Sequence, residues 1–233
     1  MNKVMNKVMN TTLEQIKSYN PCRASYVQLL HGLNKTKADS EPLEFRNIYN
    51  ILCKSDLFWA TKVLDKKIRV HVGALFADTV KHLNKDKRVH DCIEVCFRYA
   101  RGEATSSELE NAYAASVAAS VATDKKYIAE GLNASAAYAA DAAVKATCGD
   151  VMLASTYTTL ASSYADAIFV YATYNPCTAR AADISYANTL YNYTRDGLAL
   201  IFLDYIEGTQ TGTQMSSNEF KMSSNKFKEK LIN

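Results

Sequence analysis

Proline and glycine are scarce in this chain. Its 233 residues include three prolines and eight glycines, and no proline lies between Pro42 and Pro176. Proline removes a backbone donor and clashes with the preceding turn, so the 133 residues between these two prolines are free to form uninterrupted helices. The patterns Gly-x-Gly-x-x-Gly, Gly-x-x-x-x-Gly-Lys-Ser/Thr, Gly-x-Ser-x-Gly and His-Glu-x-x-His are all absent. The sequence therefore lacks the common signatures of phosphate-binding loops, nucleophile elbows and zinc sites.

Long apolar runs and a strong excess of one charge are also missing. No stretch of about 18 or more apolar residues occurs, so no transmembrane helix is predicted. The first ten residues are basic but lack the apolar segment and small-residue cleavage site of a signal peptide. With 27 Lys and Arg against 24 Asp and Glu, the net charge of +3 is too even to indicate an electrostatic nucleic-acid binder. We therefore expect a soluble cytoplasmic protein with neither membrane nor nucleic acid as a partner.

The six cysteines form no disulfide or metal-binding pattern. They are scattered through a chain whose 48% hydrophobic residues suffice for a core without covalent links, so free thiols are expected. Cys92 and Cys96 share a helix face near His90 and Glu94, but a tetrahedral site for a soft metal needs two further ligands. Packing in the core is the favoured interpretation of this pair. We predict no metal and no cofactor.

Alanine doublets are the most informative feature that is present. Between residues 112 and 146 they include Ala114-Ala115, Ala118-Ala119, Ala136-Ala137, Ala139-Ala140 and Ala142-Ala143. Alanine loses almost no side-chain entropy in a helix and lets two helices approach closely. The predicted fold is all-α, a multi-helix bundle with alanine-rich antiparallel helices and a flexible C-terminal tail.

Capping signals and apolar spacing set the expected helix boundaries. Thr11-Thr12-Leu13-Glu14 and Thr105-Ser106-Ser107-Glu108 have the form of capping boxes, Asn20-Pro21 is typical of a helix start, and Gly102 is typical of a C-cap. Helices are expected near 11–19, from 20 onward, in two short pieces between 43 and 64, and at 68–83, 86–101, 106–122, 124–147, 150–174 and 178–206.

These helices group into a predicted domain organisation of four parts. Residues 1–10 form a flexible arm, 11–102 an N-terminal helical region, 103–207 an alanine- and tyrosine-rich helical region packed on it, and 208–233 a polar flexible tail. The tail repeats a heptapeptide, since residues 215–221 recur with one change as residues 222–228.

Two cysteines end a repeated tetrapeptide. Tyr-Asn-Pro-Cys closes at Cys22 and again at Cys177, with Arg23 beside the first and Arg180 one turn after the second. A thiol in the first turn of a helix has a lowered pKa, and a nearby guanidinium lowers that pKa further, so both are candidate reactive thiols. The favoured alternative is that Asn-Pro simply starts a helix and cysteine is a small apolar filler.

The fifteen tyrosines supply the candidate binding residues. Tyr157, Tyr164 and Tyr171 recur every seven residues along one predicted helix, and Tyr191 lies on the next, together with Arg180. A ring that packs over alanine leaves its hydroxyl available to a polar partner. Packing within the core is the plainer interpretation of these residues. The alternative is a groove that binds a protein or a small polar ligand.

Segments within about residues 19–150 resemble one group of proteins. They are the run from Leu29 to Leu43, Leu57-Phe58-Trp59-Ala60, Val80-Lys81-His82-Leu83, and Arg98-Tyr99-Ala100-Arg101-Gly102-Glu103-Ala104-Thr105. In these segments the chain resembles a family of largely uncharacterised alanine-rich proteins of tailed phages and prophages, some of which bear a provisional immunity-protein label. The resemblance implies a protein of the host cell cytoplasm, and it assigns no activity and no functional residue.

Three functions are weighed on this basis. The first is a non-enzymatic phage accessory protein that binds or sequesters a host factor or small ligand through a helical, tyrosine-rich surface, in counter-defence or host takeover. The second is a virion-associated structural protein, with homo-oligomers held together by the arm and tail. The third is an enzyme that uses Cys22 or Cys177 as nucleophile. The first is favoured, and an enzyme is the less favoured class.

Overall fold

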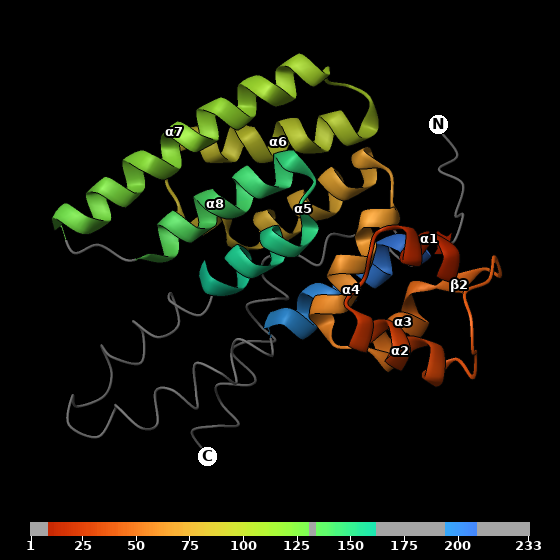
Figure 1. The fold of residues 1–233 in the computed structure, drawn as a ribbon. Coiled ribbons are helices and arrows are strands. Elements are labelled where there is room, and N and C mark those ends of the chain that lie inside the picture. Colours follow the sequence, from red (N-terminus) through yellow and green to blue (C-terminus); the bar gives the residue numbers. More distant parts are fainter. Residues whose placement is uncertain (1–8, 131–133, 162–193, 209–233) are drawn as a thin grey trace, which may run out of the picture. The chain divides into compact units, whose positions relative to one another are not determined.

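The computed structural model describes residues 9–130, 134–161 and 194–208 (Figure 1). Most of these residues lie in helices, and the described strands are a short antiparallel pair, β1 (Asn10–Thr11) and β2 (Leu43–Glu44). The predicted all-α, multi-helix fold is therefore confirmed. Residues 1–8 of the predicted arm and residues 209–233 of the predicted tail lie outside the described residues. Within the described ranges, no helix combines the length and apolar character needed to cross a bilayer.

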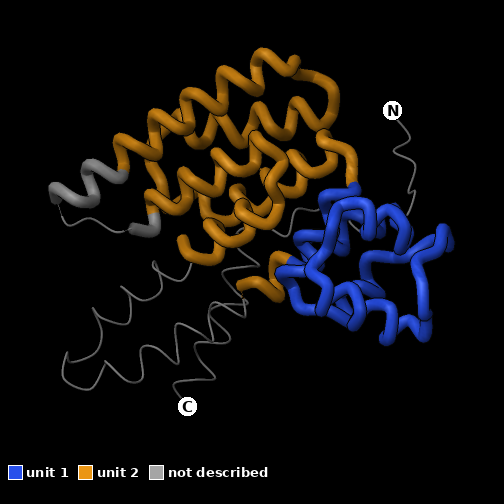
Figure 2. The backbone as a smooth tube through the Cα atoms, in the orientation of Figure 1, with its two compact units in different colours: residues 1–63, 199–233 blue, residues 64–198 orange. Residues whose placement is uncertain are grey.

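The chain divides into two compact units (Figure 2). Unit 1 comprises residues 1–63 and 199–233, and unit 2 comprises residues 64–198. The expected boundary near Gly102 falls inside unit 2, between α6 (Lys87–Arg101) and α7 (Ser106–Glu130). Helices on both sides of Gly102 share one hydrophobic core, because α6 packs against α7 and also against α5 and α8. The glycine ends a helix without ending a domain.

Unit 1 forms its core from short helices. They are α1 (Leu13–Ser18), α2 (Arg23–Gly32), α3 (Phe45–Ile51), α4 (Lys54–Ala60) and the 3-10 turn η1 (Thr61–Val63). A further helix spans residues 194–207, and its residues 199–207 belong to unit 1. Phe45 meets Phe202 edge to face, with ring centroids 5.3 Å apart. Thr11 pairs with Leu43 across the strand ladder, and the Met9 N–H donates to the Ile206 carbonyl over 3.1 Å. The two ends of the described chain therefore meet in one unit.

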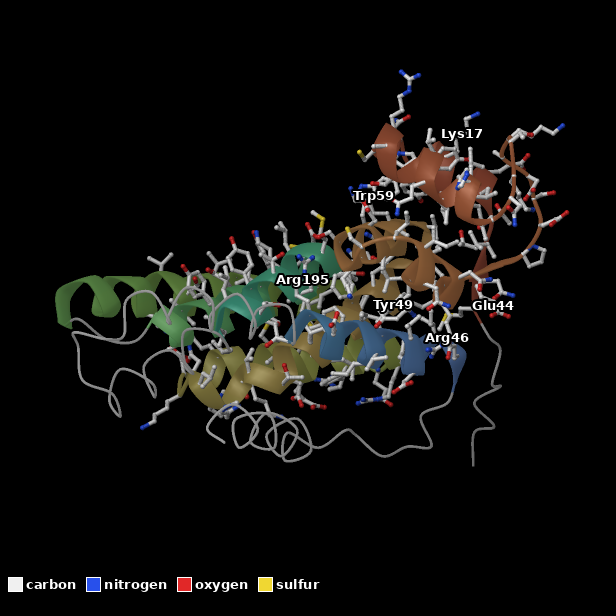
Figure 3. All side chains as sticks on the ribbon, turned by 90° about the horizontal axis from the view of Figure 1, so that it is seen from below. Lys17, Glu44, Arg46, Tyr49, Trp59 and Arg195 are labelled. Atoms are coloured by element: carbon white, nitrogen blue, oxygen red, sulfur yellow. The ribbon has the colours of Figure 1, made fainter. Side chains whose placement is uncertain are left out.

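An ion pair reinforces this junction. Arg46 donates from Nε to one oxygen of Glu207 over 2.7 Å and from Nη2 to the other over 2.6 Å. Figure 3 shows Arg46 on α3, next to the end of the C-terminal helix. The two residues are 161 positions apart in the sequence, so this bidentate contact locks the C-terminal helix to α3.

Unit 2 is a bundle of longer helices. Besides α6 and α7 it contains α5 (Lys66–Val80), the 3-10 turn η2 (Lys81–Leu83), α8 (Ala134–Cys148) and a helix whose described part is residues 151–161. Helix α8 packs against α5, α6 and α7, and Figure 1 shows it running alongside all three. Its position at the centre of the bundle explains its composition, because a helix with neighbours on several sides needs small side chains.

The alanines of α8 allow close contact with its neighbours in this bundle. Five of them are completely buried: Ala139, Ala140, Ala142, Ala143 and Ala146. On the facing helix, a Cβ placed on Gly73 would lie 2.9 Å from the Ala146 Cα, which is closer than carbon atoms pack. The backbones of α5 and α8 thus meet at a glycine–alanine contact, as the alanine doublets predict.

The two sequence-predicted capping boxes have different outcomes. At Thr105 the box forms in full: the Glu108 N–H donates to Thr105 Oγ1 over 3.2 Å, and the Thr105 N–H donates to Glu108 Oε2 over 2.8 Å. Near the N-terminus the cap is Thr12, which accepts from the Gln15 N–H, so the prediction of Thr11 was wrong by one residue. Thr11 is instead part of β1, where its backbone pairs with β2.

Other predicted boundaries shift for local reasons. Gly102 is the C-cap of α6, as predicted, with a left-handed φ of 79°. Helix α2 starts at Arg23 with Cys22 as its N-cap, whereas Asn20 has a left-handed φ of 53° and is not the cap. Helix α7 runs to Glu130, past the break expected at 122–124, because neither glycine nor proline interrupts the chain before Gly131.

Candidate functional site

The structure describes one member of the predicted tyrosine set. Tyr157 is half-buried in the helix at 151–161 and packs against the core of unit 2. The other predicted binding residues, Tyr164, Tyr171, Tyr191 and Arg180, lie outside the described residues. The candidate site is therefore built from Tyr157 and its neighbours.

Tyr157 belongs to a cluster of two tyrosines and a lysine. It stacks on Tyr138 of α8, with ring centroids 6.2 Å apart and ring planes inclined by 28°. The Lys145 Nζ lies over the Tyr157 ring, 6.0 Å from its centroid. We call Tyr138, Lys145 and Tyr157 the tyrosine–lysine cluster. All three side chains are half-buried.

The hairpin after α8 brings these residues together. Gly149 takes a left-handed φ of 66°, and Asp150 caps the next helix by accepting from the Leu153 N–H over 3.1 Å. The chain therefore reverses within two residues and runs back along α8. Tyr138 and Lys145 are seven residues, or about two helical turns, apart, so they share the face of α8 that meets Tyr157.

The cluster has the chemistry of a recognition surface. A lysine held over an aromatic ring presents a cation next to an apolar plate, and the phenols add hydroxyl groups that donate and accept. Such a combination suits a partner that carries a carboxylate beside an apolar group. Sequence reasoning missed Tyr138 and Lys145 because it followed the spacing of tyrosines along one helix, while the contact crosses a hairpin. The signal that could have found them is Gly149-Asp150, which predicts that hairpin.

Unit 1 also contains lysines over aromatic rings, but their geometry is local. Lys54 Nζ lies 5.7 Å from the Tyr49 ring centroid, and Lys62 Nζ lies 5.3 Å from that of Trp59. Each pair is separated by at most five residues along the chain. The tyrosine–lysine cluster differs, because its stacked rings come from two helices that the fold brings together.

Cys22 is exposed at the N-terminus of α2. The backbone N–H groups of Ser25 and Ala24 lower the pKa of its thiol, since they stabilise the thiolate by hydrogen bonding. Cys22 is the N-cap of α2 and lies just before the first turn in which the sequence prediction placed it, and Arg23 is not among the groups that lower its pKa. Its counterpart Cys177 lies outside the described residues, so the second half of the repeated motif has no structural comparison.

Cys92 and Cys96 are buried in the core of unit 2, 1% and 0% exposed. The Cys92 Sγ lies 3.7 Å from the carbonyl oxygen of Ala143 on α8, and a contact with the Cys92 thiol together with burial raises the pKa of Cys96. Their surroundings are those of packed core thiols, the favoured interpretation from the sequence. Among the residues that the structure describes, no group of three or more His, Cys, Asp or Glu side chains could hold a metal ion.

His71 is a half-buried histidine on α5. Its ring meets Phe97 of α6 with centroids 5.3 Å apart and planes inclined by 69°. Burial, with a smaller contribution from the positive charge of Arg101, lowers its pKa from 6.5 to about 4. The imidazole is therefore neutral at pH 7 and contributes to packing between α5 and α6.

Comparison of the chain with protein-family models, with curated proteins and with solved structures finds no match in any of the three.

Proposed function

We propose that this protein is a non-enzymatic phage accessory protein that binds a host protein through the tyrosine–lysine cluster of unit 2. The observation that carries the proposal is the stacked Tyr138–Tyr157 pair with Lys145 above it, assembled from two helices on a close-packed scaffold. Tyrosine is enriched at protein interfaces because it contributes a large rigid contact area together with a hydroxyl group.

The properties of the cluster select the kind of partner. Lys145 supplies a positive charge, and the two rings supply an apolar surface, so the preferred partner is a protein segment with an acidic residue next to an apolar one. A small polar ligand with a carboxylate is the alternative occupant of the same surface. The resemblance to phage and prophage proteins supports a host protein as partner, with a role in host takeover or counter-defence.

The experiment is affinity capture with matched charge reversals. The full chain is immobilised and exposed to a bacterial lysate as wild type, as Lys145→Glu, and as Lys62→Glu, in which the lysine over Trp59 of unit 1 is reversed. We expect a protein that is retained by wild type and by Lys62→Glu and is lost from Lys145→Glu. Circular dichroism verifies that both variants are folded.

Two results contradict the proposal. One is that neither a protein nor a small molecule released by denaturation is retained by the wild-type chain. The other is retention that Lys145→Glu leaves unchanged, because the partner then binds elsewhere. A Tyr157→Phe variant refines a positive result, since it removes one hydroxyl and keeps the stacked ring.

A further inference from the structure

We draw no further inference here: the strongest candidate, the side-chain cluster in unit 1 formed by the exposed thiols of Cys22 and Cys53 at the starts of α2 and α4 together with Asp56, carries nothing, because in the described part of the chain the link between the two thiols rests only on the effect of the Asp56 charge on the pKa of Cys22.

Discussion

Gly73→Ala tests the close contact between α5 and α8. Two effects oppose one another: alanine is favoured over glycine inside a helix by about 1 kcal/mol, while overpacking of a core typically costs about 1–3 kcal/mol. The new Cβ would lie 2.9 Å from the Ala146 Cα and 3.3 Å from its Cβ. The nearer atom belongs to the backbone and cannot rotate away, so the two helices must separate. The overpacking cost therefore exceeds the propensity gain.

Because the obstructing atom belongs to the backbone, the overpacking cost falls in the upper part of its range, about 2–3 kcal/mol. We therefore expect Gly73→Ala to lower the free energy of unfolding by about 1–2 kcal/mol and Tm by roughly 2–8 °C. Far-UV circular dichroism during urea and thermal unfolding measures both quantities. Ala146→Gly removes the methyl group at 3.3 Å and leaves the Cα at 2.9 Å, so the double variant should be only somewhat more stable than the sum of the two single effects predicts. A Gly73→Ala chain as stable as wild type, or more stable, would refute the close approach of these two backbones.

Three further predictions concern other contacts. In the unfolded chain His71 takes up a proton near pH 6.5, whereas in the folded chain it does so only near pH 4. The free energy of unfolding should therefore fall by about 3 kcal/mol as the pH drops from 6.5 to 4. His71→Gln should flatten this slope, and an unchanged slope would contradict the lowered pKa of His71. Glu207→Gln breaks the bidentate contact with Arg46 and should lower the free energy of unfolding by about 1 kcal/mol in low salt and by less in high salt. An equal loss of unfolding free energy at both salt concentrations would show that the pair contributes no charge interaction. Cys22 should react with iodoacetamide at pH 7 several-fold faster than free cysteine, with Cys22→Ser to identify its signal, and a rate no faster than the free amino acid ends the case for an activated thiol.

Features that depend on nearby residues were readable from the sequence. The capping box at Thr105 and the left-handed C-cap at Gly102 each involve contacts within a few residues, so the local pattern suffices to predict them. The misplaced N-terminal cap shows the limit of this reasoning. Thr11 and Thr12 have the same capping chemistry, and the choice between them depends on Leu43, with which Thr11 pairs across a strand ladder.

Features that depend on distant residues were not predictable in the same way. Arg46 and Glu207 are both ordinary surface residues in the sequence, and their pairing requires the chain to bring residues 161 positions apart together. The tyrosine–lysine cluster shows the same limitation, because Tyr138 and Tyr157 meet across a hairpin rather than along one helix. Residues 111–123 contain no Asp, Glu, Lys or Arg, which is visible in the sequence, but only the packing of α7 shows that Tyr113 and Val121 are exposed.

The central claim of this account is that α8 lies at the close-packed centre of unit 2 and makes a rigid scaffold for the surfaces around it. Hydrogen exchange of the full chain, followed by mass spectrometry, tests this claim most directly. The account predicts that amides between residues 139 and 146 exchange at least about 100-fold more slowly than those of α2, in which Leu29 alone is buried. Exchange in α8 as fast as in α2 would contradict it.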